Sequence, residues 1–137
     1  MAGHLFRRTH QVGTAVFYEE MNREGLDITP FQFAALSALQ LNPGADQASV
    51  AAWTACDRAT VGGVVDRLVE KGYVSRKVSE KDRRARVLHL TESGRETLAR
   101  AQEVAEKIQG LLTDGLSPEE SETLTHLLLK VLETHPR

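Results

Sequence analysis

Basic side chains gather in one stretch of this 137-residue chain, between positions 58 and 86. The stretch has nine basic and four acidic residues and a net charge of +5, whereas the remainder has eight basic and 15 acidic residues and a net charge of −7. The basic residues are Arg58, Arg67, Lys71, Arg76, Lys77, Lys81, Arg83, Arg84 and Arg86. Such a split attracts phosphate to one surface and repels it elsewhere. It favours a nucleic-acid partner over the alternative, an evenly solvated charged surface.

Residues 58–71 are predicted to form a helix, with Asp57 as its N-cap and Gly72 just beyond its end. On a helical wheel, Val61, Val64, Val65 and Leu68 face inward, and Ala59, Gly63, Asp66, Arg67 and Glu70 face outward, with Thr60 and Gly62 on the flanks. The outward face is therefore small and polar over its first two turns.

Two adjacent glycines in this helix, Gly62 and Gly63, together cost about 2 kcal/mol of helix propensity relative to alanine. Without side chains there, the helix can lie closer to base edges in the major groove, while Arg58, Thr60 and Arg67 reach bases or phosphates. The alternative is that one glycine, Gly62 first, lets a neighbouring helix pack closely. All five residues are candidate DNA contacts.

A β-hairpin is predicted from the alternating segments 73–78 and 86–90 around a polar tip, residues 79–85. The cationic residues at or near the tip are Lys81, Arg83, Arg84 and Arg86. Long cationic side chains at a hairpin tip can enter a narrow minor groove or bind phosphate, although a solvated charged turn is the alternative. We expect Asp82 to pair with a neighbouring arginine, because an unpaired carboxylate would repel phosphate.

Helices are predicted to position these elements, so the fold class is mainly α with a small β-hairpin wing. The expected helices cover residues 4–24, 30–41, 47–54, 91–113 and the segment from 117 onward. Thr29 and Gln32 form a capping box before the second of these helices. Helices 47–54 and 58–71, joined by a tight turn, are typical of a helix-turn-helix, and Trp53 is expected in the core.

Aliphatic stripes mark the helices at both ends of the chain. Their residues are Leu5, Val12 and Val16 in the first helix, Leu98, Ala101, Ala105, Ile108 and Leu112 in residues 91–113, and Leu124, Leu127, Leu128, Val131 and Leu132 in the last. A domain this small has difficulty covering so many stripes alone. We expect them to meet a second subunit; the alternative is packing within one chain.

Several functional classes lack support. The five histidines show no metal-ligand spacing and the single cysteine, Cys56, forms no thiolate cluster, so no metal or cofactor is expected. No nucleophile has an identifiable base partner, which argues against an enzyme. No apolar run suffices to cross a bilayer and residues 1–11 lack the apolar core of a signal peptide, so we expect a cytoplasmic protein.

The segments 57–68, 71–74 and 82–91, together with Gly94, resemble the signature of the MarR family of winged helix-turn-helix regulators. The order of elements is similar over essentially the whole chain. The resemblance implies a triangular dimer that binds a pseudopalindromic operator, usually as a repressor of neighbouring genes, and is released by a small phenolic or carboxylate ligand. It implies a single domain, 1–137, with a DNA-binding lobe over 29–91 and dimerisation helices over 1–25 and 92–137.

The form of the recognition helix, residues 57–63, resembles the branch of the family that responds to aromatic acids. That branch binds its ligand between the dimerisation helices and the DNA-binding lobe. By this resemblance Arg8 is the first candidate for a carboxylate contact, with His10 on the adjoining face of the helix and Phe33 as an aromatic wall. A solvated surface arginine is the alternative.

Two other functions stay open at this point. Cys56 precedes a helix N-terminus, where a thiolate is favoured, so it could sense oxidants; buried packing is the alternative. A winged helix can also serve as a protein-interaction module without DNA binding. That role, however, gives no reason for a small outward face beside an arginine-rich hairpin tip.

Overall fold

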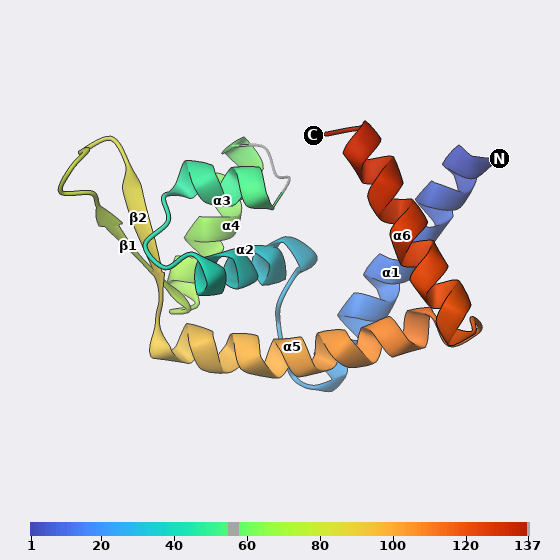
Figure 1. The fold of residues 1–137 in the computed structure, drawn as a ribbon. Coiled ribbons are helices and arrows are strands. Elements are labelled where there is room, and N and C mark those ends of the chain that lie inside the picture. Colours follow the sequence, from blue (N-terminus) through green and yellow to red (C-terminus); the bar gives the residue numbers. More distant parts are fainter. Residues whose placement is uncertain (55–57, 137) are drawn as a thin grey trace.

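One long helix, α5 (Glu92–Leu112), runs beneath the whole molecule (Figure 1). The computed structural model describes residues 1–54 and 58–136, and of Arg58 the backbone alone. Over the first half of α5 stand α2 (Pro30–Leu41), α3 (Gln47–Trp53), α4 (Arg58–Glu70) and the hairpin of β1 (Val74–Val78) and β2 (Arg86–Leu90). Toward its other end lie α1 (Ala2–Arg23) and α6 (Pro118–Thr134). The predicted fold class, mainly α with a β-hairpin wing, is confirmed.

Side chains cap the start of α2, as predicted, and also the start of α3. Thr29 Oγ1 accepts the Gln32 N–H at 3.1 Å and Gln32 Oε1 accepts the Thr29 N–H at 3.2 Å, which completes the predicted capping box. Asp46 caps α3, since its Oδ1 accepts the Ser49 N–H at 2.7 Å, and this bond lowers the pKa of Asp46. The cap therefore stabilises the fold above the ordinary aspartate pKa, and that contribution is lost as the pH falls through the lowered value.

The core lies between α5 and the helices above it. Its fully buried members include Leu36 and Leu39 of α2, Val65 and Leu68 of α4, Leu88 of β2 and Leu98 of α5. Ala101, Val104 and Ile108 continue the buried stripe of α5 within the same chain. Leu98, Ala101 and Ile108 of the predicted stripe therefore pack within their own chain, whereas Leu112 at the end of α5 is exposed.

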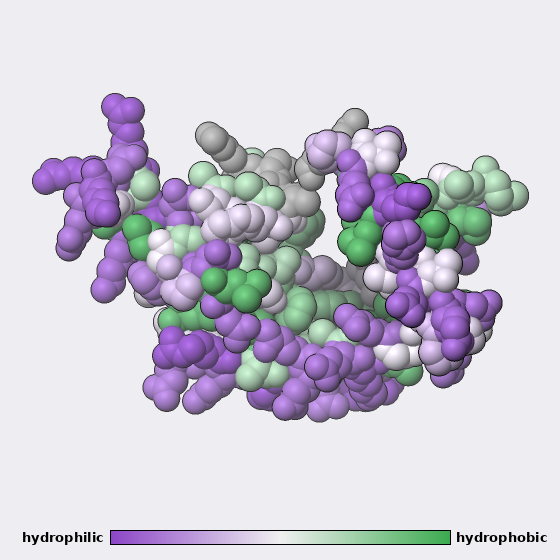
Figure 2. All heavy atoms as spheres, in the orientation of Figure 1, coloured by the Kyte–Doolittle hydropathy of each residue, from purple (hydrophilic) through white to green (hydrophobic). Residues whose placement is uncertain are grey.

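The aliphatic stripe of α6 is different. All of α6 is described, and none of its residues is buried. Leu124, Leu127, Leu128, Val131 and Leu132 are exposed, as are Leu5 and Val12 of α1, and apolar atoms show on this part of the surface in Figure 2. Among the described residues no helix is long and apolar enough to cross a membrane. These exposed faces are thus what the fold leaves uncovered.

A third segment, residues 44–46, pairs with strand β2 of the hairpin. The sequence pattern did not predict this pairing. Ala45 accepts the Leu88 N–H at 2.9 Å, and the Gly44 N–H donates to the Leu88 carbonyl at 3.2 Å. Asp46 forms an isolated antiparallel bridge with Val87. Three residues are too few to show alternation. The loop between α2 and α3 thereby holds one side of the hairpin.

Trp53 does not lie in the core. Its side chain is 52% exposed at the C-terminal end of α3, so the core assignment is wrong. The neighbouring residues Val50 and Ala51 supply the buried face of this helix instead. A helix of seven residues has room for one short buried face, and the tryptophan falls outside it.

The start of α5 lies against the chain between α4 and β1. A Cβ built on Gly94 would come within 2.0 Å of the Tyr73 carbonyl oxygen. Thr91 secures the same place, because its N–H donates to Tyr73 O at 3.0 Å and its Oγ1 donates to Gly72 O at 2.6 Å. Gly94 is therefore required by close approach of two backbones.

We predict that Gly94→Ala lowers the free energy of unfolding by about 1–3 kcal/mol, because overpacking against a backbone carbonyl forces the chain to shift. Urea denaturation measures the change. Gly110→Ala is the matched control in the same helix: nothing lies within 4 Å of its added Cβ, and stability should hold or rise. Equal stability of the two variants would contradict the close contact.

Candidate nucleic-acid interface

The helix α4 presents the predicted face to solvent. Val61, Val65 and Leu68 are buried and Val64 is half-buried. Ala59, Thr60, Gly63, Asp66, Arg67 and Glu70 are exposed. The 3.6-residue period thus places a small, polar face outward, because the core occupies the opposite side.

Neither glycine of α4 is required by packing inside the chain. Among the described residues, a Cβ on Gly63 would have nothing within 4 Å, and one on Gly62 would meet only the Gln47 side chain at 3.7 Å, an ordinary contact. The alternative in which Gly62 permits close approach of a neighbouring helix therefore loses its support. The space beside Gly63 opens to the outside, where a ligand could approach the helix backbone.

The residues before α4 carry several of the sequence expectations. Cys56, proposed as a redox sensor or packing residue, and Asp57, the expected cap, lie outside the described residues. Arg58 begins the helix, as predicted, and only its backbone is described. Thr60 and Arg67 are exposed on this helix, at the positions from which a side chain would reach bases or phosphates.

The hairpin tip holds its cationic side chains in solvent. Lys81, Arg83, Arg84 and Arg86 are all exposed. Asp82 stabilises the tip in another way than predicted: its Oδ1 accepts the Arg84 backbone N–H at 3.0 Å, and its carbonyl accepts the Ala85 N–H at 3.0 Å. The expected pairing with an arginine side chain is wrong, because the carboxylate is turned into an Asx-type turn. The arginine side chains keep their charge for an outside partner.

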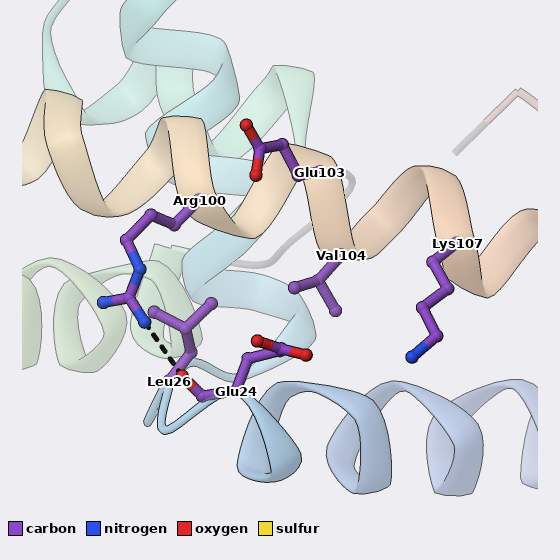
Figure 3. A pocket seen from close by; sticks show the side chains of 6 residues that line it. All are labelled: Glu24, Leu26, Arg100, Glu103, Val104 and Lys107. Atoms are coloured by element: carbon purple, nitrogen blue, oxygen red, sulfur yellow. Dashed lines mark hydrogen bonds between the residues drawn. The ribbon is translucent and has the colours of Figure 1, made fainter.

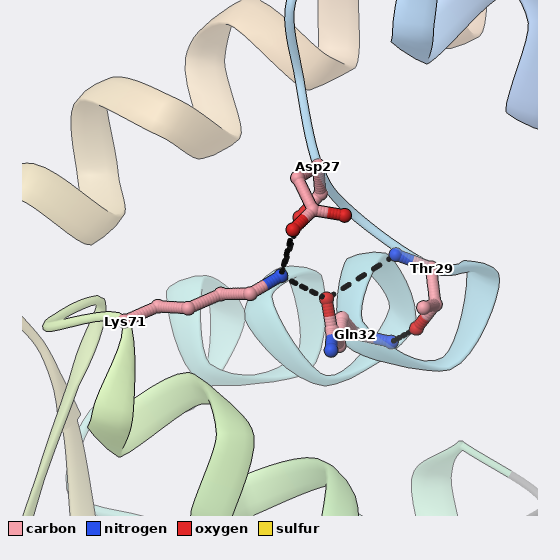
Figure 4. A network of polar contacts seen from close by, with 4 residues as sticks. All are labelled: Asp27, Thr29, Gln32 and Lys71. Carbon is pink, nitrogen blue, oxygen red and sulfur yellow. Dashed lines mark hydrogen bonds and ion pairs between the residues drawn. The ribbon is translucent and has the colours of Figure 1, made fainter.

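Lys71 is a basic residue of the same stretch that the fold uses internally. Its Nζ donates to the Asp27 carbonyl and to Gln32 Oε1, the latter at 3.1 Å, and lies 3.6 Å from Asp27 Oδ2 (Figure 4). Gln32 Oε1 also accepts from the Thr29 N–H, so Lys71 completes the cap of α2. The ammonium group ties the end of α4 to the loop after α1. The Lys71 side chain is thereby used within the fold.

Sequence reasoning also missed an ion pair within the basic stretch. Arg76 Nη1 of β1 lies 2.6 Å from Asp66 Oδ1 of α4. Ten positions separate the two residues, and a hairpin's approach to a helix cannot be read from periodicity. Arg76 and Asp66 thus pair two opposite charges that both lie within the basic stretch, and the arginines of the hairpin tip are cations of the stretch that stand in solvent.

The proposed ligand residues are not gathered into one site by this chain. Arg8 and His10 are exposed on the first half of α1. Phe33 is half-buried and its ring packs edge-on against Phe17, with centroids 6.1 Å apart. Phe17 follows Arg8 by nine positions, about 13 Å along a helix. A combined site would need a change of conformation or a second subunit.

The cavity of about 200 Å³ between α5 and the end of α1 involves none of those residues (Figure 3). Its lining consists of Glu24, Leu26, Arg100, Glu103, Val104 and Lys107. Arg100 Nη2 donates to the Glu24 carbonyl at 2.9 Å, and Lys107 Nζ lies 3.0 Å from Glu20 Oε2. These cations therefore already have partners within the fold. Among the described residues, no cluster of histidine, cysteine, aspartate or glutamate could hold a metal ion.

Comparison with known proteins places the whole arrangement. The sequence model of the MarR family matches residues 25–85. The transcriptional repressor NicR of Pseudomonas putida is 33% identical over 132 residues, covering 96% of this chain and 82% of NicR. BpsR of Bordetella bronchiseptica, whose DNA binding is regulated by 6-hydroxynicotinic acid, has a structure 32% identical, with a TM-score of 0.88 and coverage of 96% of this chain and 92% of that chain.

A solved structure bound to DNA is similar as well. The transcriptional repressor CouR on a 23-mer DNA duplex is 30% identical, with a TM-score of 0.88, and the alignment covers 96% of this chain and 92% of that chain. The likeness therefore extends from α1 to α6, beyond the segment that the family model matches. These similar proteins are transcriptional regulators and not enzymes.

We predict that Gly63→Leu leaves the fold intact and abolishes DNA binding, because the added side chain fills open space beside the helix backbone. Helix propensity rises by up to about 1 kcal/mol, so thermal stability should hold or improve. Gel shift and thermal denaturation of the same preparation measure both effects, and Gly63→Ala should be intermediate. A sharp loss of stability with DNA binding retained by the folded fraction would identify Gly63 as a packing residue.

Proposed function

The chain belongs to the MarR family of transcriptional regulators, and on this premise we propose a repressor that binds a pseudopalindromic operator as a homodimer and is released by a small aromatic acid. One observation carries the DNA-binding part: the open, side-chain-free patch at Gly63 and the exposed arginines of the hairpin tip lie on one lobe. Such a lobe offers one surface for a groove and another for phosphate. The regulated genes would include those beside its own.

In the proposed complex α4 enters the major groove. Gly62 and Gly63 let the helix backbone lie close to the bases, while Arg58, Thr60 and Arg67 contact base edges or phosphates. The hairpin tip lies over the adjacent minor groove or backbone, bound through Lys81, Arg83, Arg84 and Arg86. The similar repressor CouR binds a DNA duplex, which supports double-stranded DNA as the partner.

The proposed division of the chain follows from the same reasoning. Residues 29–91 form the DNA-binding lobe, and residues 1–25 and 92–137 supply the dimerisation helices of a single domain, 1–137. The first half of α5 also packs beneath the lobe, through Leu98 and Ala101. Within the segment 92–137, the partner-facing part is therefore α6 and the end of α5.

A second copy of the chain is the proposed cover for the exposed helices at its ends. Leu124, Leu127, Leu128, Val131 and Leu132 project from α6 without burial, next to an open groove of about 430 Å³ at the start of that helix. Exposed apolar surface of this extent is rare on a monomer. A two-fold dimer would bury these stripes against each other and would match the symmetry of an inverted repeat.

The effector part of the proposal rests on chemistry shared with a relative. 6-Hydroxynicotinic acid, which regulates DNA binding of BpsR, is an aromatic carboxylate. Arg8 offers a guanidinium fork suited to a carboxylate, with His10 nearby on α1 and Phe33 as an aromatic wall. Because one chain leaves Arg8 far from Phe33, the proposed pocket requires a second subunit or a change of conformation. A tenfold loss of operator affinity needs only about 1.4 kcal/mol of differential ligand binding.

We predict that the protein binds an inverted repeat as a dimer, with half-sites centred about 10 bp apart, and that Arg84→Ala weakens binding to every sequence. Loss of one phosphate contact in each protomer should reduce the dependence of log affinity on log salt by about 1.8 in the dimer. Fluorescence anisotropy over a salt series measures it. Changes at Thr60 or Arg67 should instead alter sequence preference. Unchanged affinity of Arg84→Ala at all salt concentrations would refute the assignment of the wing.

We predict that benzoate-like or hydroxycinnamate-like acids release the protein from DNA, and that Arg8→Ala abolishes this response while dimerisation and operator binding persist. Calorimetric titration with the acids and with their neutral amides tests the charge requirement, since only the acids can pair with a guanidinium. Equal binding of acid and amide, or a full response in Arg8→Ala, would exclude this arginine and direct attention to Arg7, His10 or an apolar ligand.

A further inference from the structure

An ion pair connects the proposed recognition helix directly to the wing. Asp66 of α4 and Arg76 of β1 meet at 2.6 Å, and their side chains are 58% and 31% exposed. Asp66 lies on the outward face of α4, three positions after Gly63 and one before Arg67. The pair therefore stands inside the proposed DNA interface and not at its margin.

The register of the hairpin explains why Arg76 reaches α4. Arg76 is paired with Leu88 across the two strands, so their side chains share one face of the hairpin. Leu88 is fully buried on that face, and so is Val74, two positions before Arg76. Arg76 thus follows the buried Val74 as the next residue of β1 on the face of the hairpin that packs against the core. It extends the contact between hairpin and helix by a polar link.

The charge of Asp66 makes this link relevant to DNA. A carboxylate on the outward face of a recognition helix repels phosphate unless a cation neutralises it. Arg76 supplies that cation from the wing, and a guanidinium can keep a carboxylate oxygen while its other N–H groups stay available. Separation of the wing from the helix would leave Asp66 uncompensated.

We propose that the Asp66–Arg76 pair determines how well the lobe discriminates its operator from other DNA, with Asp66 as a positioning residue that holds Arg76 and the wing at one orientation to α4. The inference rests on the proposed DNA-binding function. Non-specific binding depends mainly on the number of charges, whereas operator binding also requires the helix and the wing to engage their grooves together. The pair should therefore influence the ratio of the two affinities more than either affinity alone.

A double-mutant cycle with Asp66→Ala and Arg76→Met tests this; methionine keeps an apolar stem without the charge. The probes are a duplex that the wild-type chain selects from a randomised library and an unrelated duplex of equal length. Asp66→Ala should strengthen non-specific binding and Arg76→Met should weaken it, because the interface gains or loses one net positive charge. The double variant should return non-specific affinity close to wild type.

The ratio of operator affinity to non-specific affinity should respond differently from the non-specific affinity itself. The ratio of operator to non-specific affinity should fall in each single variant by up to about fivefold for each protomer that engages the DNA, the factor that corresponds to one exposed ion pair of up to about 1 kcal/mol. It should fall no further in the double variant, because either change alone already removes the pair. Thermal midpoints should barely change, since both groups are partly exposed.

Lys77→Met is the matched control. Lys77 neighbours Arg76 in β1, and its register partner is Val87, so its side chain lies on the opposite face of the hairpin. Its loss should weaken non-specific binding as Arg76→Met does and leave the ratio unchanged. If the ratio were unchanged in Asp66→Ala and Arg76→Met too, or fell additively in the double variant, the proposed role would be overturned. Failure of the wild-type chain to select any sequence would instead refute the DNA-binding function itself.

Discussion

The contact between the backbone of Tyr73 and the first turn of α5 is the constraint on which the other arrangements depend. Gly94 allows the two backbones to approach, and Thr91 binds both Gly72 and Tyr73 from the start of the helix. The end of α4, the beginning of β1 and the start of α5 thereby meet at one point. Any larger residue at Gly94 would separate the proposed DNA-binding elements from the helix that supports them.

Much of the fold could be predicted because local sequence patterns mark where helices begin and end. The cap at Thr29 and the glycine after α4 mark boundaries that the structure confirms. The expectations that failed depend on what lies across space. Trp53 is exposed because a seven-residue helix offers one short buried face. Leu98 and Ala101 of α5 are buried within their own chain because the DNA-binding lobe packs on them, while Leu112 at the end of α5 stays exposed.

The candidate interface shows the same division between local and distant information. The outward face of α4 and the cationic hairpin tip follow from period and alternation, and both are confirmed as exposed. What a charge count could not reveal is which cations are already engaged. Lys71 binds Gln32 and the loop after α1, and Arg76 pairs with Asp66. The carboxylate of Asp82 accepts the Arg84 backbone N–H and so pairs with no arginine side chain. Those partners lie far along the chain or within a turn, where pattern reasoning has no signal.

Because α6 is exposed, the stability of the protein should depend on its concentration. A helix of 17 residues that buries no side chain in its own chain has little to stabilise it in water. If a second copy covers it, the free energy of unfolding and the ordering of α6 share one equilibrium with assembly. Apparent stability then rises with protein concentration. A cell that makes few copies would hold part of them as chains with frayed ends, so the abundance of the protein would itself set the threshold at which an operator becomes occupied.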